Sequence, residues 1–476
     1  MKSAATFRIW LLGTVFGLTV GIAGQAAATS LTDAVRIAVD SNPEIGQAIE
    51  DRAATGFELQ QALGLYSPRV DLEASTGGEL LSNPSRRAAG IDKNVLLPSE
   101  VGVTVSYDLF DSGYRDSERD RQAARLDGAA LRVLERSEFV GLEIAQQYFE
   151  VLLQARIRDI AQQNVAFHQD TLKKVNDLLG KTVTDADVQQ AEERLAAARA
   201  RYSEAQEALD AAKSSYQSLV GLPFVKGATP SRVGHALPAT LDDAMGIARS
   251  NNPKLRIASA DIDAASSLVD QSKSGLGPKL SFEGGANIGQ DIGGTEGATG
   301  DLNGKLVLKM NLWDGGIQRA QVQENVHRET QSMLAQQQTL REVEDDVRTS
   351  WDRIHSQATL STQYRAQLSA SNDLVSSYSD QFTVGSRSLL DVLDAQNGKF
   401  GVQILAETAD FGVRFSEYRL MAATGQLLSF LGVTAPESAT ADTRQKVGVT
   451  SADASEPRYH SPLRLDGPID LTTYSK

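Results

Sequence analysis

Two segments of the chain carry apolar residues at alternating spacings of three and four over many turns. They run from Asp187 to Val220 and from Leu389 to Phe430. A sustained 3.5-residue period is typical of a coiled-coil seam, and small residues at alternate seam positions let a partner backbone approach closely. We therefore predict two helices that pack lengthwise against other long helices, through seam residues that include Val188, Ala191, Leu195, Ala198, Val392, Ala406 and Val413.

Each seam segment follows an even longer segment with a helical pattern. These preceding helices are expected from about Tyr114 to Leu179 and from about Ile317 to Phe382. At a rise of 1.5 Å per residue, each would be about 100 Å long, which no globular core requires. A further helix is expected near the start of each half of the chain, from Leu31 to Leu65 and from Leu241 to Gly275.

Four shorter segments alternate apolar and polar residues with a period of two, which is typical of a strand with one apolar face. Each is about as long as the 9–11 residues that cross a bilayer as a tilted strand. Four strands leave two open edges, which hydrocarbon does not tolerate, so closure into a barrel would require several chains. A small antiparallel sheet in water is the alternative. The residues expected to face lipid are Val101, Val103, Val105, Leu280, Phe282, Leu306 and Leu308.

A short turn joins the second strand of each pair to the long helix that follows. The turn is written YDLFDSG in the first half and MNLWDGG in the second. In each motif the aspartate is expected to cap the helix, and the next two residues to supply the turn. The aromatic residue is expected at the membrane edge, with an ordinary core position as the alternative. These junction residues are Phe110, Asp111 and Gly113, and then Trp313, Asp314 and Gly315.

The two halves of the chain form an internal repeat. SLTDAVRIAVDSNPEIGQAIE at Ser30 returns as TLDDAMGIARSNNPKLRIASA at Thr240, and the two junction motifs follow in the same order. Each copy predicts a helix, two strands, a long helix and a returning helix. The copies are expected at residues 29–220 and 241–433, with a linker at 221–240. Residues 434–476 lack periodicity and are expected to be a disordered periplasmic tail.

Residues 1–28 are expected to be a secretory signal peptide. Lys2 and Arg8 accompany an apolar run from Ile9 to Ala23, and three alanines ending at Ala28 form a small-residue cleavage site. An uncleaved anchor is the alternative, but the run is short for a membrane span. No later stretch approaches the roughly 18 apolar residues of a membrane helix. We therefore expect an exported protein without a spanning helix.

Composition argues against several other classes of protein. The chain has 476 residues, a formal net charge of -14 and no cysteine. An acidic protein is a poor partner for nucleic acid, and the absence of cysteine excludes disulfides and thiolate metal sites. The five histidines show no metal-ligand spacing, and no catalytic constellation or phosphate-binding loop is found. We expect neither an enzyme nor a bound cofactor or metal.

The sequence resembles the TolC family of outer-membrane channels over about Leu31 to Val433. The most specific match is FTVGSRSLLDVLDAQ, from Phe382 to Gln396; its partner is TDADVQQAEERL at Thr184, followed by LVGLP at Leu219. The resemblance implies an α+β membrane protein in the outer membrane of a Gram-negative bacterium. It implies a homotrimer with a twelve-stranded β-barrel and an α-helical periplasmic tunnel. It also implies a periplasmic adaptor and an inner-membrane ABC or RND-type transporter as partners.

The resemblance also assigns residues to the periplasmic entrance. Asp391 and Asp394 match the acidic pair that lines the entrance, and Arg387 matches the arginine that helps to hold it closed. Asp187 matches the acidic partner in the first hairpin. Phe382 stands where a tyrosine is expected, so any hydrogen bond through that hydroxyl is lost.

Two functions fit these elements. The first is a passive export channel for type I protein secretion or small-molecule efflux, two cargo classes that the sequence does not distinguish. The second is a structural or adhesive coiled-coil surface protein without a pore. Only the channel accounts for four short amphipathic strands that occur as two repeated pairs, so we expect an export channel.

Overall fold

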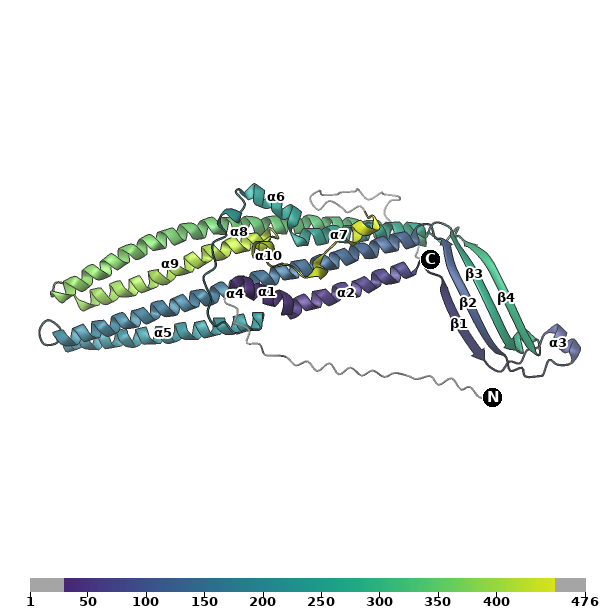
Figure 1. The fold of residues 1–476 in the computed structure, drawn as a ribbon, viewed down its shortest axis with the longest axis horizontal. Helices are drawn as coiled ribbons and strands as arrows, with labels where there is room; N and C mark the ends of the chain where they lie inside the picture. The colour runs from purple at the N-terminus through teal and green to yellow at the C-terminus, as the bar shows by residue number, and fades with distance from the viewer. Residues whose placement is uncertain (1–29, 450–476) are drawn as a thin grey trace, which may run out of the picture.

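The protein is elongated, with a wall of long helices and a four-stranded sheet at one end (Figure 1). The computed structural model describes residues 30–449. The predicted signal peptide at residues 1–28 and the last part of the predicted tail, residues 450–476, lie outside the described residues. Within the described range, no helix has both the length and the apolar character needed to cross a membrane.

Four helices form two antiparallel hairpins whose tips lie at the end of the molecule opposite the sheet (Figure 1). α4 (Tyr114–Leu178) returns as α5 (Asp185–Val220), and α8 (Ile317–Thr383) returns as α9 (Leu389–Ala423). The predicted extents of α4 and α8 are confirmed. The seam positions face the partner helices, and those that are buried include Ala191, Leu195, Ala198, Val392, Val402, Ala406 and Val413.

The single helices predicted at the start of each half are wrong, because each is broken in two at an Asn-Pro step. α1 (Leu31–Ser41) is followed by α2 (Pro43–Gly64), and α6 (Leu241–Asn251) by α7 (Pro253–Ser274). The asparagine between the two helices has an extended backbone, since the ring of a following proline disfavours the helical region. Its side chain then caps the next helix by accepting a hydrogen bond from an N–H of the first turn.

The last helix also ends earlier than predicted. α9 stops at Ala423, and the short helix α10 (Leu427–Phe430) follows after a turn. Gly425 makes this turn with a φ of 71°, which L side chains rarely adopt. A Cβ on Gly425 would also lie 2.8 Å from the backbone oxygen of Asn251. The turn therefore requires glycine, and the seam changes direction there.

The helices form a wall one layer thick. Near the sheet, α4 lies between α2 and α7, and α7 packs on α8 (Figure 1). Near the tips, α4 packs with α5, α8 packs with α9, and a contact between α4 and α9 joins the two hairpins. The largest buried cluster joins α1, α4, α5 and α10 in the middle of the molecule. A single layer cannot bury both of its faces. Large apolar side chains accordingly stay exposed in the single chain, and they include Phe57, Phe139, Leu334 and Leu405.

The four predicted strands are confirmed as one antiparallel sheet in the order β1-β2-β3-β4. They are β1 (Arg69–Thr76), β2 (Ser99–Phe110), β3 (Lys279–Gln290) and β4 (Ala298–Lys309). The loops at the end of the sheet away from the helices contain α3 (Pro84–Ala89) and the short 3-10 helix η2 (Ile292–Gly294). In the described chain, β1 and β4 each have one edge without a neighbouring strand.

The prediction of disorder after residue 433 is wrong for residues 434–449. They form the 3-10 helix η3 (Glu437–Ala439) and α11 (Thr443–Val447), which both pack on α4. The reason is a buried ion pair between Arg444 and Asp127 at 3.0 Å, a contact between distant residues that leaves no periodic pattern in the sequence. The linker at 221–240 contains the short 3-10 helix η1 (Gly234–Ala236).

Candidate functional site

One face of the sheet is apolar along all four strands. The register pairs Leu72 with Val103, Val103 with Ala286, and Ala286 with Leu302, so these side chains point to the same side. In the single chain Leu302 is 86% exposed. The structure brings all the residues expected to face lipid onto this face: Val101, Val103, Val105, Leu280, Phe282, Leu306 and Leu308.

The opposite face of the sheet is polar. Near the helices its basic residues are held in ion pairs, with Lys305 3.1 Å from Glu283 and Lys279 2.9 Å from Asp108. Further from the helices this face carries the acidic residues Glu73, Glu100 and Asp301. A sheet with one apolar and one charged face can separate hydrocarbon from a water-filled space.

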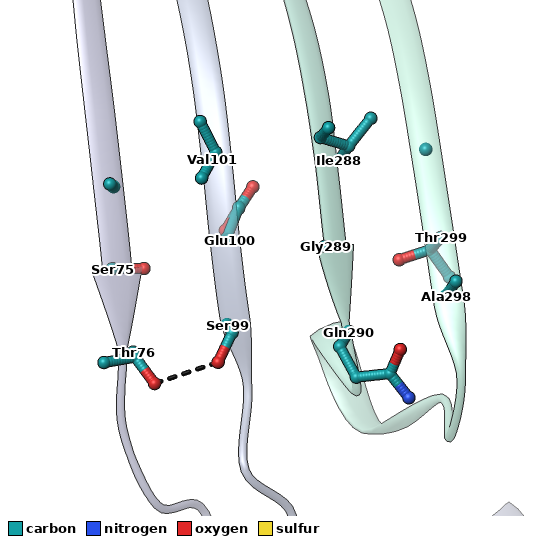
Figure 2. A pocket seen from close by; sticks show the side chains of 12 residues that line it. Ser75, Thr76, Ser99, Glu100, Val101, Ile288, Gly289, Gln290, Ala298 and Thr299 are labelled. Carbon is teal, nitrogen blue, oxygen red and sulfur yellow. Dashed lines mark hydrogen bonds between the residues drawn. The ribbon is translucent and has the colours of Figure 1, made fainter. Parts of the chain in front are cut away.

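A hollow of about 820 Å³ lies at the loop end of the sheet and touches all four strands (Figure 2). Its lining includes Glu100, Val101 and Ile288, and the hydroxyls of Thr76 and Ser99 share a hydrogen bond of 2.9 Å at its edge. The lining combines residues of both faces of the sheet. We interpret the hollow as the curved end of the sheet, beneath its loops, and not as a binding pocket.

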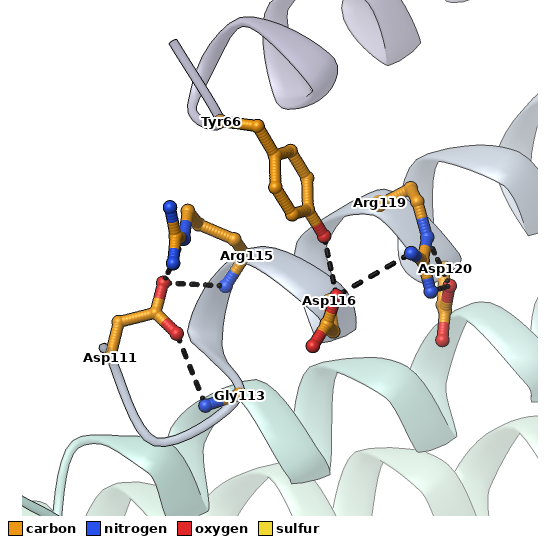
Figure 3. Close-up of polar contacts among 7 residues, drawn as sticks. All are labelled: Tyr66, Asp111, Gly113, Arg115, Asp116, Arg119 and Asp120. Atoms are coloured by element: carbon orange, nitrogen blue, oxygen red, sulfur yellow. Dashed lines mark hydrogen bonds and ion pairs between the residues drawn. The ribbon is translucent and has the colours of Figure 1, made fainter. Parts of the chain in front are cut away.

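At the first junction, Asp111 caps α4 (Figure 3). Its carboxylate accepts hydrogen bonds from the backbone N–H groups of Gly113 and Arg115, both at 3.2 Å, and from the Arg115 side chain at 2.7 Å. Ser112 and Gly113 adopt left-handed conformations, with φ values of 57° and 91°, and so bend the chain from the strand into the helix within two residues. The strand therefore passes into the helix through the turn that the sequence predicts.

Tyr66, which follows α2, fastens that helix to the same junction (Figure 3). Its hydroxyl donates to Asp116 at 2.6 Å, and the Arg115 guanidinium lies 5.2 Å from its ring centroid. Burial and the hydrogen bond to Asp116 raise the pKa of Tyr66 to about 12, so the hydroxyl keeps its proton at neutral pH. The sequence analysis missed Tyr66, because its partners reach it only after the intervening strands have folded.

The second junction repeats this design. Asp314 accepts hydrogen bonds from the backbone N–H groups of Gln318 and Gly316, both at 2.9 Å, and these bonds lower the pKa of its carboxyl. Gly315 and Gly316 are both left-handed and make the turn. The aromatic residues of both junctions are exposed in the single chain, Phe110 by 52% and Trp313 by 81%.

At the hairpin tips, two of the predicted entrance residues stabilise helix starts. The Asp187 carboxylate accepts hydrogen bonds from the backbone N–H of Thr184 at 2.8 Å and from its hydroxyl at 2.7 Å. This pair is a capping box at the start of α5. Asp391 accepts a hydrogen bond of 2.7 Å from the Ser388 hydroxyl at the start of α9. Both carboxylates therefore have structural partners within the chain.

Arg387 makes its contacts inside the second hairpin. Its guanidinium lies 4.1 Å from the ring centroid of Tyr378, donates to Gln381 at 3.1 Å, and lies 3.9 Å from Asp391. The structure thus does not bring Arg387 to Asp187 within the described chain. A pairing between them would require the hairpin of a neighbouring chain.

Contacts that the sequence analysis missed join the two hairpins. Arg194 on α5 lies 3.5 Å from Asp394 on α9, and buried Gln396 donates to Asn164 on α4 at 2.8 Å. Arg201 donates to Asn397 one helical repeat further along. Because Arg194 and Arg201 are seven residues apart, they share one face of α5, and this spacing was the available signal.

Phe382 belongs to a small apolar cluster shared by the two tips. Its buried members come from both hairpins: Val175, Val183, Ala191, Leu389 and Leu393. A phenyl ring suits this environment because it brings no hydroxyl that would need a partner. The tips are therefore held by apolar packing where a tyrosine was expected.

No metal site emerges from the residues that the structure describes, since no group of three or more His, Asp or Glu side chains there is placed to hold an ion. His168, on α4, is a buried histidine with 5% of its surface exposed. Burial and the charges of Arg194 and Arg201 lower its pKa, so its imidazole is neutral at neutral pH.

The chain is similar to known proteins along most of its length. A family model described as outer membrane efflux protein matches residues 34–222 and 244–426. The outer membrane efflux protein BepC of Brucella suis is 23% identical over 431 residues, which make up 90% of this chain and 91% of that protein. The alkaline protease secretion protein AprF of Pseudomonas aeruginosa is 24% identical over 416 residues, or 82% of each chain.

The fold is also similar to that of a solved structure, the outer membrane protein VceC from Vibrio cholerae. The TM-score is 0.71 at 15% sequence identity, and the match covers 85% of this chain and 96% of that chain. The predicted fold class, a long helical barrel with strands at one end, is confirmed.

Proposed function

Because the chain belongs to the outer membrane efflux protein family, we propose that three copies assemble into a conduit across the outer membrane and periplasm of a Gram-negative bacterium. The protein is an outer-membrane export channel. The sheet crosses the outer membrane, the helical wall encloses a tunnel, and the hairpin tips point toward the inner membrane. There the channel works with a periplasmic adaptor and an inner-membrane transporter of the ABC or RND type.

The two-faced sheet is the observation that carries this proposal. Its apolar face is exposed, with Leu72 73% and Leu308 68% accessible in the single chain. Its outer strands β1 and β4 have free edges in the described chain. Exposed apolar surface favours lipid, but lipid does not tolerate unpaired backbone groups. Pairing of β1 with β4 of a neighbouring chain satisfies both requirements.

The size of the barrel favours three copies, the number that the family resemblance implies, over two. Two chains would close an eight-stranded barrel, whose interior is filled by side chains. Three chains close a twelve-stranded barrel and leave room for a water-filled lumen lined by the charged face. The one-layer helical wall supports the same assembly, because packing of neighbouring copies covers apolar side chains such as Phe57 and Leu334.

The hairpin tips form the entrance of the tunnel. Asp391 and Asp394 are three residues apart on α9, and threefold symmetry brings six such carboxylates around one opening. A ring of carboxylates attracts cations and favours their passage. Arg194, 3.5 Å from Asp394, offsets part of this charge. Arg387 and Asp187, which lie on different hairpin tips and are not paired with each other in the described chain, are the pair proposed to bond between neighbouring chains.

The channel is a passive conduit, and its transporter selects the cargo. A relative named for efflux and a relative named for protease secretion are about equally similar to this chain, at 23% and 24% identity. Both cargo classes are therefore served by this architecture. Pull-down of the inner-membrane transporter with the tagged channel from its native host distinguishes them.

The decisive experiment measures assembly and conductance. Outer membranes should yield a trimer that migrates as a trimer in unheated detergent samples and as a monomer after heating. The purified trimer should form discrete conductance steps in planar lipid bilayers. Replacement of Asp391 and Asp394 with alanine should weaken cation selectivity. A water-soluble rod without conductance would instead identify a coiled-coil surface protein.

A further inference from the structure

Residues 434–449 follow both copies of the repeat and lie beyond the segments matched by the family model. They run along the part of the wall nearest the sheet, where η3 packs on α4 and α2 and α11 packs on α4 (Figure 1). This segment places one long basic side chain inside the wall, since Arg444 is 9% exposed. A buried arginine in a short terminal segment needs a structural reason.

Arg444 joins the two copies of the repeat. Its Nε donates to Asp127 Oδ2 on α4 at 3.0 Å, and its Nη1 donates to Asp263 Oδ2 on α7 at 2.6 Å. Both aspartates are buried, with Asp127 1% and Asp263 6% exposed. α4 belongs to the first copy and α7 to the second. One guanidinium therefore bridges two buried carboxylates on neighbouring helices.

Asp127 also holds the backbone of the segment. Its Oδ1 accepts a hydrogen bond from the Thr443 N–H at 2.8 Å, and its Oδ2 accepts one from the Arg444 N–H at 3.0 Å. The carboxylate thus caps the start of α11 while it pairs with the side chain that α11 carries. Asp127 thus makes three hydrogen bonds to this one segment and fixes its position on α4.

We propose that residues 434–449 are a C-terminal clip whose docking completes the helical wall. Two carboxylates that approach each other in a buried site repel, and a guanidinium between them converts the repulsion into two charge-assisted hydrogen bonds. Because a chain is made from its N-terminus, both copies of the repeat exist before the clip does. The stable arrangement of α4 against α7 then depends on the last described part of the chain.

The first test compares thermal unfolding of the full-length trimer with two single variants. Arg444→Ala should lower Tm by roughly 5 °C or more, because it removes one partner of a buried charge contact. The Tm of Arg444→Lys should lie between those of the wild type and Arg444→Ala, since an ammonium keeps the charge but cannot bond to both carboxylates with the geometry of a guanidinium. Lys446→Ala is the matched control, because Lys446 also lies on α11 but is 71% exposed. Its Tm should equal that of the wild type.

The second test separates the charge contact from a general loss of packing. In the Arg444→Ala background, Asp127→Asn together with Asp263→Asn should recover at least half of the lost Tm, because neutral amides need no cation. Equal Tm values for Arg444→Ala and Lys446→Ala, or no recovery by the two amides, would overturn the clip. A stable trimer that conducts no ions would contradict the export function and leave the clip standing.

Discussion

The two ends of the helical wall are held together by different kinds of contact. Near the sheet, Arg444 bridges two carboxylates in a site from which water is almost excluded. Near the tips, Arg194 and Asp394 face each other with side chains 33% and 61% exposed. Loss of one partner from a buried pair costs about 3–5 kcal/mol, whereas an exposed pair contributes about 0–1 kcal/mol. The charged contact near the sheet is therefore strong, and the charged contact near the tips is weak.

This difference fits the proposed channel, in which the sheet crosses the membrane and the tips form the entrance. The apolar cluster around Leu389 and Leu393 gives the tips their resting contact. It is much smaller than the cluster in the middle of the wall that contains Tyr148 and Tyr216. We therefore expect the tips to separate at a lower cost than the middle of the wall.

The sheet end should tolerate charge on one face only. Leu302→Arg should cost about 2–4 kcal/mol per chain, because Leu302 lies on the apolar face near the middle of β4, and should reduce the amount of assembled trimer. Asn303→Arg makes the same change one residue away on the opposite, polar face, and should assemble normally. Heat-modifiable mobility of outer-membrane trimers measures both. Equal assembly of the two variants would contradict the assignment of the faces.

The middle of the wall should weaken as pH rises. Glu138 accepts hydrogen bonds from the N–H groups of Leu427 and Leu428 at the start of α10, and burial raises its pKa to about 7. Between pH 4.5 and 7 the unfolded chain ionises this carboxyl while the folded chain keeps the proton. Stability therefore falls across this window, by up to about 3 kcal/mol.

Glu138→Gln should remove this pH dependence, because the amide oxygen can still accept a hydrogen bond and carries no charge. The difference in Tm between pH 5 and pH 8 should be clearly smaller in the variant than in the wild type. Glu135→Gln, at a more exposed position on the same helix, is the control and should change the difference little. An unchanged pH profile in Glu138→Gln would show that Glu138 ionises normally in the folded protein.

The seam of α5 should respond to added volume. Ala198 is 3% exposed, and Ala198→Leu should cost about 1–3 kcal/mol per chain, since it forces extra atoms into a close helix contact. Ala197→Leu, on the exposed side of the same helix, should be nearly neutral. Thermal unfolding measures both variants. If their Tm values agree, the seam has been assigned to the wrong face.

The tips should show the smallest change in stability and a clear change in function. Arg194→Ala removes a partly exposed ion pair and should alter unfolding by less than about 1 kcal/mol. It should nevertheless raise single-channel conductance in planar bilayers, because α5 and α9 lose a tie at the entrance. Arg387→Ala should act in the same direction. Arg199→Ala, fully outside these contacts on the exposed face of α5, should leave conductance unchanged.

Patterns that depend on neighbours in the sequence predicted much of this molecule. The long helices and the four strands follow from periodicities of 3.5 and two residues, and the capping of α4 by Asp111 follows from a motif of three residues. The Asn-Pro steps at Pro43 and Pro253 were visible in the same way, and the helix breaks there could have been predicted. For the entrance, the spacing of Asp391 and Asp394 placed them on one helix face.

The partners of the charged residues could not be predicted, because each partner comes from a distant part of the chain. Arg194 meets Asp394 across 200 positions, and Arg444 meets Asp127 across 317. Neither contact alters the periodicity of the segments that it joins. The order of residues 434–449 was missed for this reason.

The sequence by itself determined where the long helices and the four strands lie, which face of each is apolar, and where each strand pair passes into its long helix. These properties depend on side chains within a few residues of one another. Only the tertiary structure decided that the two copies lie side by side in one layer, which charges are buried, and which stay in water. A carboxylate acquires its partner and its exposure only when helices far apart in the chain are brought together. The difference between the buried bridge near the sheet and the exposed ion pair near the tips therefore arises from packing.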